Sequence, residues 1–162
     1  MDRIRINARD ILEGAVRIEE TGEKFYRGQA EKVEEPQVKN LFSHLAEQEA
    51  QHRETFSRML ADIKTGETSL SGSYFSYLTD QVVFPSMVDR ELPEELDTAA
   101  ALDFAIKREL DSMLYYMEIK RAVVSSQQDV IDRIVDEERK HFTDLSELKA
   151  RLFPSGQRAE QR

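Results

Sequence analysis

The chain has 162 residues and a formal net charge of −9, so it is long enough for one domain with a sizeable core, and its acidity disfavours binding of a nucleic acid through the phosphates. Apolar residues make up 40% of the chain and charged residues 34%, with only 6 Gly and 4 Pro, a balance that favours long amphipathic helices over a turn-rich β fold. The absence of cysteine excludes disulfides, iron–sulfur centres and thiolate zinc sites within this chain.

The first two predicted helices span residues 8–33 and 36–64, where apolar residues recur every three or four positions. Pro36 is the first residue of the second predicted helix, a position at which proline is tolerated. Gly66 follows this helix and is the predicted C-terminal stop. The connection between the two helices is short. We therefore expect them to be antiparallel neighbours.

The middle of the chain, residues 65–96, breaks the helical pattern. It contains two Gly, two Pro and the aromatic patch Tyr74–Tyr77. We interpret it as a long crossover. The patch could cover the bundle or mediate dimerisation, and we favour the first role.

A second helix pair follows the crossover. The third predicted helix spans residues 98–124 after the N-cap candidate Asp97. Residues 125–128 read as a short polar turn, and the fourth helix then runs from the N-cap candidate Asp129 to about residue 153.

Two antiparallel helix pairs joined by one long crossover predict an all-α, ferritin-like four-helix bundle. We expect one domain over residues 1–153 and a polar, disordered tail over residues 154–162. No segment approaches the length of a membrane span, and the first five residues contain no apolar run resembling a signal peptide. We therefore expect a cytoplasmic protein with neither a membrane nor a nucleic-acid partner.

Ionisable residues interrupt the apolar stripe of every predicted helix. A lone carboxylate that points into a core is costly, so these groups require partners. The residues are Glu19 on the first helix, Glu49 and His52 on the second, Glu109 on the third, and Glu138 and His141 on the fourth.

The spacing of these residues repeats between the two halves of the chain. The first half places Tyr26 seven residues after Glu19, and the second places Tyr116 seven residues after Glu109. In each half a glutamate and a histidine three positions apart follow on the next helix, on one face of it. With a rise of about 1.5 Å per residue, the three groups of each half converge within about one helical turn.

The repeat favours a metal site over its alternative, a buried network with a merely structural role. A glutamate three residues before a histidine is weak support by itself. The same pair preceded twice by a glutamate and a tyrosine at equal spacing, all on inward stripes, is much harder to obtain by chance. Carboxylate and imidazole groups are the ligands that such a site needs.

Over about residues 8–152 the sequence resembles the rubrerythrin-related branch of the ferritin-like di-iron proteins. Matching segments are EETGEKFY at 19–26, EAQH at 49–52 and EERKH at 137–141. The resemblance implies two iron ions, whose charge four carboxylates would balance, although zinc or another divalent metal could occupy such a site in a crystal. The ligands that it implies are Glu19, Glu49, His52, Glu109, Glu138 and His141.

The chain departs from rubrerythrin proper in two respects. Rubrerythrin carries an extra carboxylate one turn after the glutamate of the third helix, where this chain has Ser112. This difference puts the redox-linked ligand shift of rubrerythrin in doubt. Rubrerythrin also has an iron domain built on four cysteines, which this chain cannot form, so an external electron donor is required.

Four further residues are candidates for supporting the metal ligands. The hydroxyls of Tyr26 and Tyr116 could hydrogen-bond to ligand carboxylates, or the rings could simply fill the core. Glu137 and Gln48 each precede a ligand glutamate. They could hold the histidine of the opposite helix pair, or they could face the solvent.

The leading functional hypothesis is an oxidoreductase that acts in oxidative stress. It would reduce hydrogen peroxide or dioxygen at the di-iron site, with electrons from a separate donor protein, and the resemblance implies a homodimer. No catalytic residue beyond the metal ligands is indicated. The alternative is an iron-binding protein or ferroxidase that handles or stores iron, and a third possibility is an interaction scaffold with a vestigial site.

Overall fold

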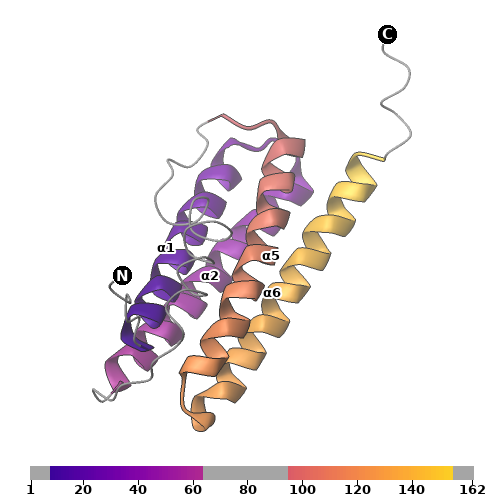
Figure 1. Cartoon of the computed structure of the whole chain (residues 1–162). Coiled ribbons are helices and arrows are strands. Elements are labelled where there is room, and N and C mark those ends of the chain that lie inside the picture. Colours follow the sequence, from indigo (N-terminus) through magenta and orange to yellow (C-terminus); the bar gives the residue numbers. More distant parts are fainter. Residues whose placement is uncertain (1–7, 64–94, 155–162) are drawn as a thin grey trace, which may run out of the picture.

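The computed structural model describes residues 8–63 and 95–154, and these form a bundle of four long α-helices (Figure 1). The helices are α1 (Ala8–Lys32), α2 (Pro36–Asp62), α5 (Thr98–Ala122) and α6 (Ser125–Leu152). α1 packs mainly against α2 and α5 mainly against α6, and contacts of α1 with α5 and of α2 with α6 join the two pairs. The predicted all-α four-helix bundle is confirmed. None of the described helices is long and apolar enough to cross a membrane.

The helix ends follow the sequence signals at two of the predicted points. Pro36 begins α2. Proline is tolerated there because the first helical residue does not need a backbone N–H, whereas an internal one does. The Asp97 side chain accepts a hydrogen bond of 2.8 Å from the backbone N–H of Ala100, and so caps α5.

The predicted start of the fourth helix is wrong. α6 begins at Ser125, directly after Val124, and not at Asp129. The polar residues that suggested a turn are helical, because the amide of Gln128 donates to the carbonyl of Lys120 at 3.2 Å and so satisfies the end of α5. The reversal of the chain is accomplished by Val123 and Val124 alone.

Several expectations fall outside the described residues. These are the stop at Gly66, the aromatic patch Tyr74–Tyr77, most of the crossover and nearly all of the C-terminal tail. α2 ends at Asp62, two residues before the predicted boundary.

The core consists of two apolar clusters with a polar layer between them. On α1, Ile18 belongs to the cluster near the start of the helix and Phe25 to the cluster near its end, so the turn that carries Glu19 lies between the two. On the other three helices the ionisable residues likewise lie between members of the two clusters. The first cluster contributes Phe56, Tyr116 and Ile134, and the second contributes Leu45, Ala105 and Leu145. The inward-facing ionisable residues of all four helices therefore meet near the middle of the bundle.

Candidate metal centre

All six predicted ligands point into the polar layer. Their residues range from 0% exposed for Glu19 to 3% exposed for the two histidines. The helical spacing explains this arrangement, because each of the six occupies an inward position of its helix between two apolar residues of the core. The predicted convergence on one inter-helix site is what the structure shows, while the role of the six as metal ligands stays a prediction.

The six residues form two overlapping groups. In each group one ligand atom per residue lies within 4.8 Å of the others. The first group contains Glu19, Glu49, His52 and Glu138, and the second contains Glu49, Glu109, Glu138 and His141. Glu49 and Glu138 belong to both groups, so they are the two carboxylates that could bridge a pair of ions. Each group also has one histidine and one glutamate of its own, as a two-metal site requires.

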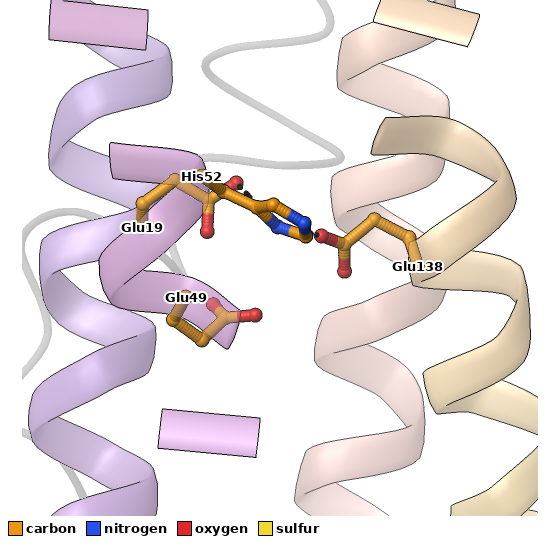
Figure 2. A group of neighbouring side chains, drawn as sticks. All are labelled: Glu19, Glu49, His52 and Glu138. Atoms are coloured by element: carbon orange, nitrogen blue, oxygen red, sulfur yellow. Dashed lines mark ion pairs between the residues drawn. The ribbon is translucent and has the colours of Figure 1, made fainter. Parts of the chain in front are cut away.

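Both histidines turn the Nδ1 atom of the ring towards the carboxylates. Nδ1 of His52 lies 2.8 Å from Oε1 of Glu138 and 3.7 Å from Oε1 of Glu19, and the ring lies between these two side chains (Figure 2). Nδ1 of His141 lies 3.4 Å from Oε2 of Glu109 and 3.6 Å from Oε2 of Glu138. The two rings are nearly parallel, with centroids 5.9 Å apart.

The polar atoms of the site fit a metal better than they fit one another. Within the described ranges, each of the six residues has at least one buried side-chain oxygen or nitrogen without a hydrogen-bond partner, and both histidines have it at Nδ1. The short contact of His52 with Glu138 lacks the geometry of a hydrogen bond. Buried polar groups are rarely left unpaired, so this set of lone pairs is the feature that a bound cation would complete.

Two tyrosines hold the two glutamates that belong to one ligand group each. Each tyrosine bonds the glutamate of the other helix pair. The hydroxyl of Tyr26 on α1 donates to Oε1 of Glu109 on α5. The hydroxyl of Tyr116 on α5 donates to Oε1 of Glu19 on α1. Each tyrosine belongs to one of the apolar clusters that enclose the polar layer, so both expected roles, filling the core and bonding a carboxylate, are fulfilled together.

Of the two candidates for holding a histidine, the structure places only one beside its partner. Oε2 of Glu137, on the half-exposed edge of α6, lies 2.6 Å from Nε2 of His52. A carboxylate on Nε2 fixes the ring so that Nδ1 faces the site. Gln48 is half-buried and makes no such hydrogen bond to His141 in the part of the chain that the structure describes, so the expected second contact is not formed.

Three residues of the polar layer were missed by the sequence reasoning as site residues. Arg108 is 3% exposed, and its Nη2 donates to the carbonyl of Ile18 at 2.7 Å and lies 3.5 Å from Oε2 of Glu49. Gly22, on α1, leaves room for that contact. Ser112 stands where rubrerythrin has its extra carboxylate. Its hydroxyl donates to the carbonyl of Arg108 at 3.0 Å, so this side chain bonds to its own helix. The available signal was position: Arg108 directly precedes a predicted ligand.

Burial raises the pKa values of three of the four carboxyl groups. Burial, and then the charges of Glu49 and Glu138, hold the pKa of Glu19 well above its usual range. Burial raises the pKa of Glu49, with a further contribution from the charge of Glu109. Burial and the neighbouring Glu138 raise the pKa of Glu109 to about 8.

The pKa values of the two histidines and of Glu138 shift in the directions that favour the charged forms of these groups. Burial opposes the protonation of His52, but its close contact with the Glu138 carboxylate outweighs this cost and raises the pKa of His52 to about 9. Burial likewise opposes protonation of His141, and its contacts with Glu109 and Glu138 raise the pKa to about 11. Burial and the charge of Glu49 would raise the pKa of Glu138, but the proximity of Glu109 and of both histidines lowers it to about 2. Without metal, the site therefore holds protons that a cation must displace.

Comparisons with known proteins agree with this geometry. A sequence model of the family described as rubrerythrin matches residues 10–149. The crystal structure of a candidate ferritin-like diiron-carboxylate protein from Thermotoga maritima is similar, with 31% sequence identity and a TM-score of 0.74. The match covers 90% of this chain and 95% of that chain. A comparison with curated proteins finds no match.

Proposed function

The chain belongs to the rubrerythrin family, and on that premise we propose that its bundle holds two iron ions and reduces hydrogen peroxide or dioxygen with electrons from an external donor. The observation that carries the proposal is the pair of overlapping ligand groups, each with one histidine and three carboxylates and with unpaired atoms aimed at a common space. Iron bound there would supply the electrons for a two-electron reduction and would act as a Lewis acid towards the oxidant.

The proposed ligand assignment follows the two groups. His52 and Glu19 would hold one ion, His141 and Glu109 would hold the other, and the two shared glutamates would contribute to both. Four carboxylates would then offset the charge of two divalent ions, and the neutral imidazoles would offer Nδ1, which is unpaired in both histidines. Nitrogen and oxygen ligands of this kind suit iron, and they also suit zinc.

The chain's own residues orient the ligands and limit the access of water. Tyr26 and Tyr116 each fix one oxygen of an unshared glutamate, which leaves the other oxygen for a metal. The carboxylate of Glu137 accepts a hydrogen bond from the Nε2–H group of His52. The apolar clusters on either side of the polar layer keep the site in a low-dielectric environment, where charge interactions are strong.

The source of the electrons is also part of the proposal. The chain has no cysteine with which to build its own iron–sulfur or rubredoxin-type centre, so a separate donor protein is needed for turnover. We further propose that the protein acts as a homodimer.

Anaerobic titration with Fe²⁺, followed by addition of peroxide or dioxygen and recorded by optical absorption, tests the proposal. We expect binding to saturate at two ions per chain, and oxidation by peroxide or dioxygen should then be rapid and stoichiometric. A protein that binds no iron under these conditions would contradict the proposal. Light scattering distinguishes this function from the alternative, iron storage. A dimer supports an oxidoreductase of the rubrerythrin type, and a large hollow shell supports storage.

A further inference from the structure

A buried arginine lies against one of the shared carboxylates. The residue, Arg108 of α5, is 3% exposed, and its Nη2 donates to the carbonyl of Ile18 at 2.7 Å. The same nitrogen lies 3.5 Å from Oε2 of Glu49. Nη1 has no hydrogen-bond partner among the described residues. A guanidinium keeps its charge at all ordinary pH values, so the polar layer contains a permanent cation.

The first helix provides the space for this contact. A Cβ atom on Gly22 would collide with Oε2 of Glu49 and with Nη2 of Arg108. At Gly28, six residues further along α1, a Cβ atom would meet nothing within 4 Å among the described residues. The absence of a side chain at Gly22 is therefore what allows the arginine and the shared glutamate to meet.

The arginine also breaks the symmetry of the repeated halves. Arg108 directly precedes Glu109, and the corresponding residue before Glu19 is the apolar Ile18. The guanidinium reaches across to α1 and bonds the backbone of that corresponding residue. Glu49 thus has a resident cation, whereas the duplicated pattern supplies no second arginine for the other shared glutamate, Glu138.

We propose that Arg108 is a positioning residue that acts as a built-in counter-cation of the metal centre. In the metal-free bundle it offsets part of the charge of the clustered carboxylates and so stabilises the fold. In the loaded bundle four carboxylates already balance two divalent ions, so the guanidinium adds an uncompensated positive charge and competes for Glu49. It therefore lowers the affinity for divalent metal and favours the reduced state of bound iron. This inference rests on the proposed metal ligation and not on the identity of the oxidant.

Substitution of Arg108 separates this role from packing. Arg108→Met removes the charge and keeps a long apolar stem, Arg108→Gln also keeps a donor for the Ile18 carbonyl, and Arg108→Lys keeps the charge. Arg58→Met is the matched control, because Arg58 is exposed and, among the described residues, pairs with Glu54 one turn away. Zinc affinity is measured by competition with a chromophoric chelator, and the melting temperature of each metal-free protein by calorimetry.

The two measurements should move in opposite directions. We expect Arg108→Met and Arg108→Gln to bind Zn²⁺ at least about tenfold more tightly than the wild type, while their metal-free forms melt at lower temperatures. Iron-loaded Arg108→Gln should also have a lower midpoint potential. Arg108→Lys should stay close to the wild type in these properties, and Arg58→Met should leave zinc affinity and midpoint potential unchanged.

A purely structural arginine predicts a different pattern. Lower melting temperatures together with unchanged or weaker zinc binding in both neutral variants would overturn the proposal. If Arg108→Met does not fold without metal, the Gln variant decides the question through its zinc affinity and midpoint potential. A wild type that binds no zinc and no iron would overturn both this inference and the proposed function, whereas tight binding with no effect of Arg108 would overturn the inference alone.

Discussion

The two histidines are the residues whose contacts differ most between the halves of the site. His52 is held at Nε2 by Glu137, whereas the contacts found for His141 within the described residues are those of its Nδ1 with Glu109 and Glu138. Both nevertheless present an unpaired Nδ1 to the carboxylates. The ring of His141 therefore depends on the metal and on packing for its orientation, and its removal is the more direct test of the site.

His141→Ala should remove most of the iron-dependent peroxide reduction while the helix content stays nearly intact. The substitution deletes the only imidazole of the second ligand group, and a lost ligand typically costs more than the roughly ten- to hundredfold loss seen for supporting residues. Turnover assays and circular dichroism check the two parts of the prediction. His44→Ala is the matched control, because His44 is exposed on α2. Wild-type turnover by His141→Ala would place the chemistry elsewhere.

Tyr116→Phe should weaken metal binding without a comparable effect on folding. The hydroxyl of Tyr116 fixes Glu19, and its loss leaves that carboxylate free to rotate, so we expect a loss of about ten- to hundredfold in metal affinity. Tyr115→Phe is the control, because the neighbouring hydroxyl donates to the carbonyl of Ile11, away from the site. Zinc competition titrations measure both variants. Equal losses in the two would show that the effect is general and not specific to the ligand.

The six inward residues could be predicted from the sequence because an ionisable side chain on an apolar stripe has few structural explanations, and here the pattern occurs twice. The crosswise tyrosine bonds could not, since each joins residues more than 80 positions apart. Arg108 was hidden for a related reason. A long charged side chain next to an inward position usually extends to solvent, and only the packing of α1 against α5 shows that this one does not.

At the scale of the helices, two of the three glycines of α1 have different surroundings. Gly22 faces the polar layer and has the ends of Glu49 and Arg108 in the space where a side chain would lie. Gly28 has open space at the corresponding point. A glycine inside a helix costs stability relative to alanine, so only at Gly22 does the site give a reason for that cost.

We therefore predict opposite consequences for two similar substitutions. Gly28→Ala should stabilise the protein by up to about 1 kcal/mol, because alanine is the better helix former. Gly22→Ala should fold, since the groups that it displaces are the ends of long side chains, but it should weaken metal binding by moving Glu49, which both ligand groups share. Urea unfolding and zinc titration measure the two properties. Undiminished metal affinity in Gly22→Ala would contradict the close approach seen here.

Helix boundaries were predictable where a single side chain determines them. Asp97 has the shape and the acceptor to cap α5, and Pro36 can begin a helix without losing a hydrogen bond. The start of α6 was not predictable in this way. Its N-cap position is Val124, which offers no side-chain acceptor, and the tight reversal is stabilised by Gln128 through a contact with the preceding helix. Four polar residues in a row suggest a turn only if their partners on another helix are ignored.

At the scale of the whole molecule, the site links proton binding to stability. The pKa values of Glu109 and His52 are raised in the folded, metal-free protein to about 8 and about 9, above their ordinary values of 4.5 and 6.5. Groups with raised pKa values stabilise the fold below their ordinary values and lose that contribution as the pH rises through the folded ones. For these two residues the loss runs from pH 4.5 to about 9.

The metal-free protein should accordingly melt at progressively lower temperatures between about pH 6 and about pH 9. Metal affinity should rise over the same range, because fewer protons must be displaced. The loaded protein should be more stable by about 4 kcal/mol when free metal exceeds its dissociation constant a thousandfold, and its melting temperature should vary less with pH. Calorimetry of both forms across this range provides the comparison. A metal-free melting temperature that rises with pH, or one that does not change on adding metal, would argue against a shared carboxylate site.

The division of ligands between the two helix pairs also determines how the halves of the chain are joined. Neither group is complete within one hairpin: the first takes three residues from α1 and α2 and one from α6, and the second takes three from α5 and α6 and one from α2. An ion in either position would act as a non-covalent cross-link between the hairpins, in addition to the covalent link of the crossover. Loss of both ions would then leave the two hairpins held by apolar packing and by the hydrogen bonds that Tyr26, Tyr116 and Arg108 make between α1 and α5. Metal release would therefore loosen the contact between the two halves of the bundle without breaking it.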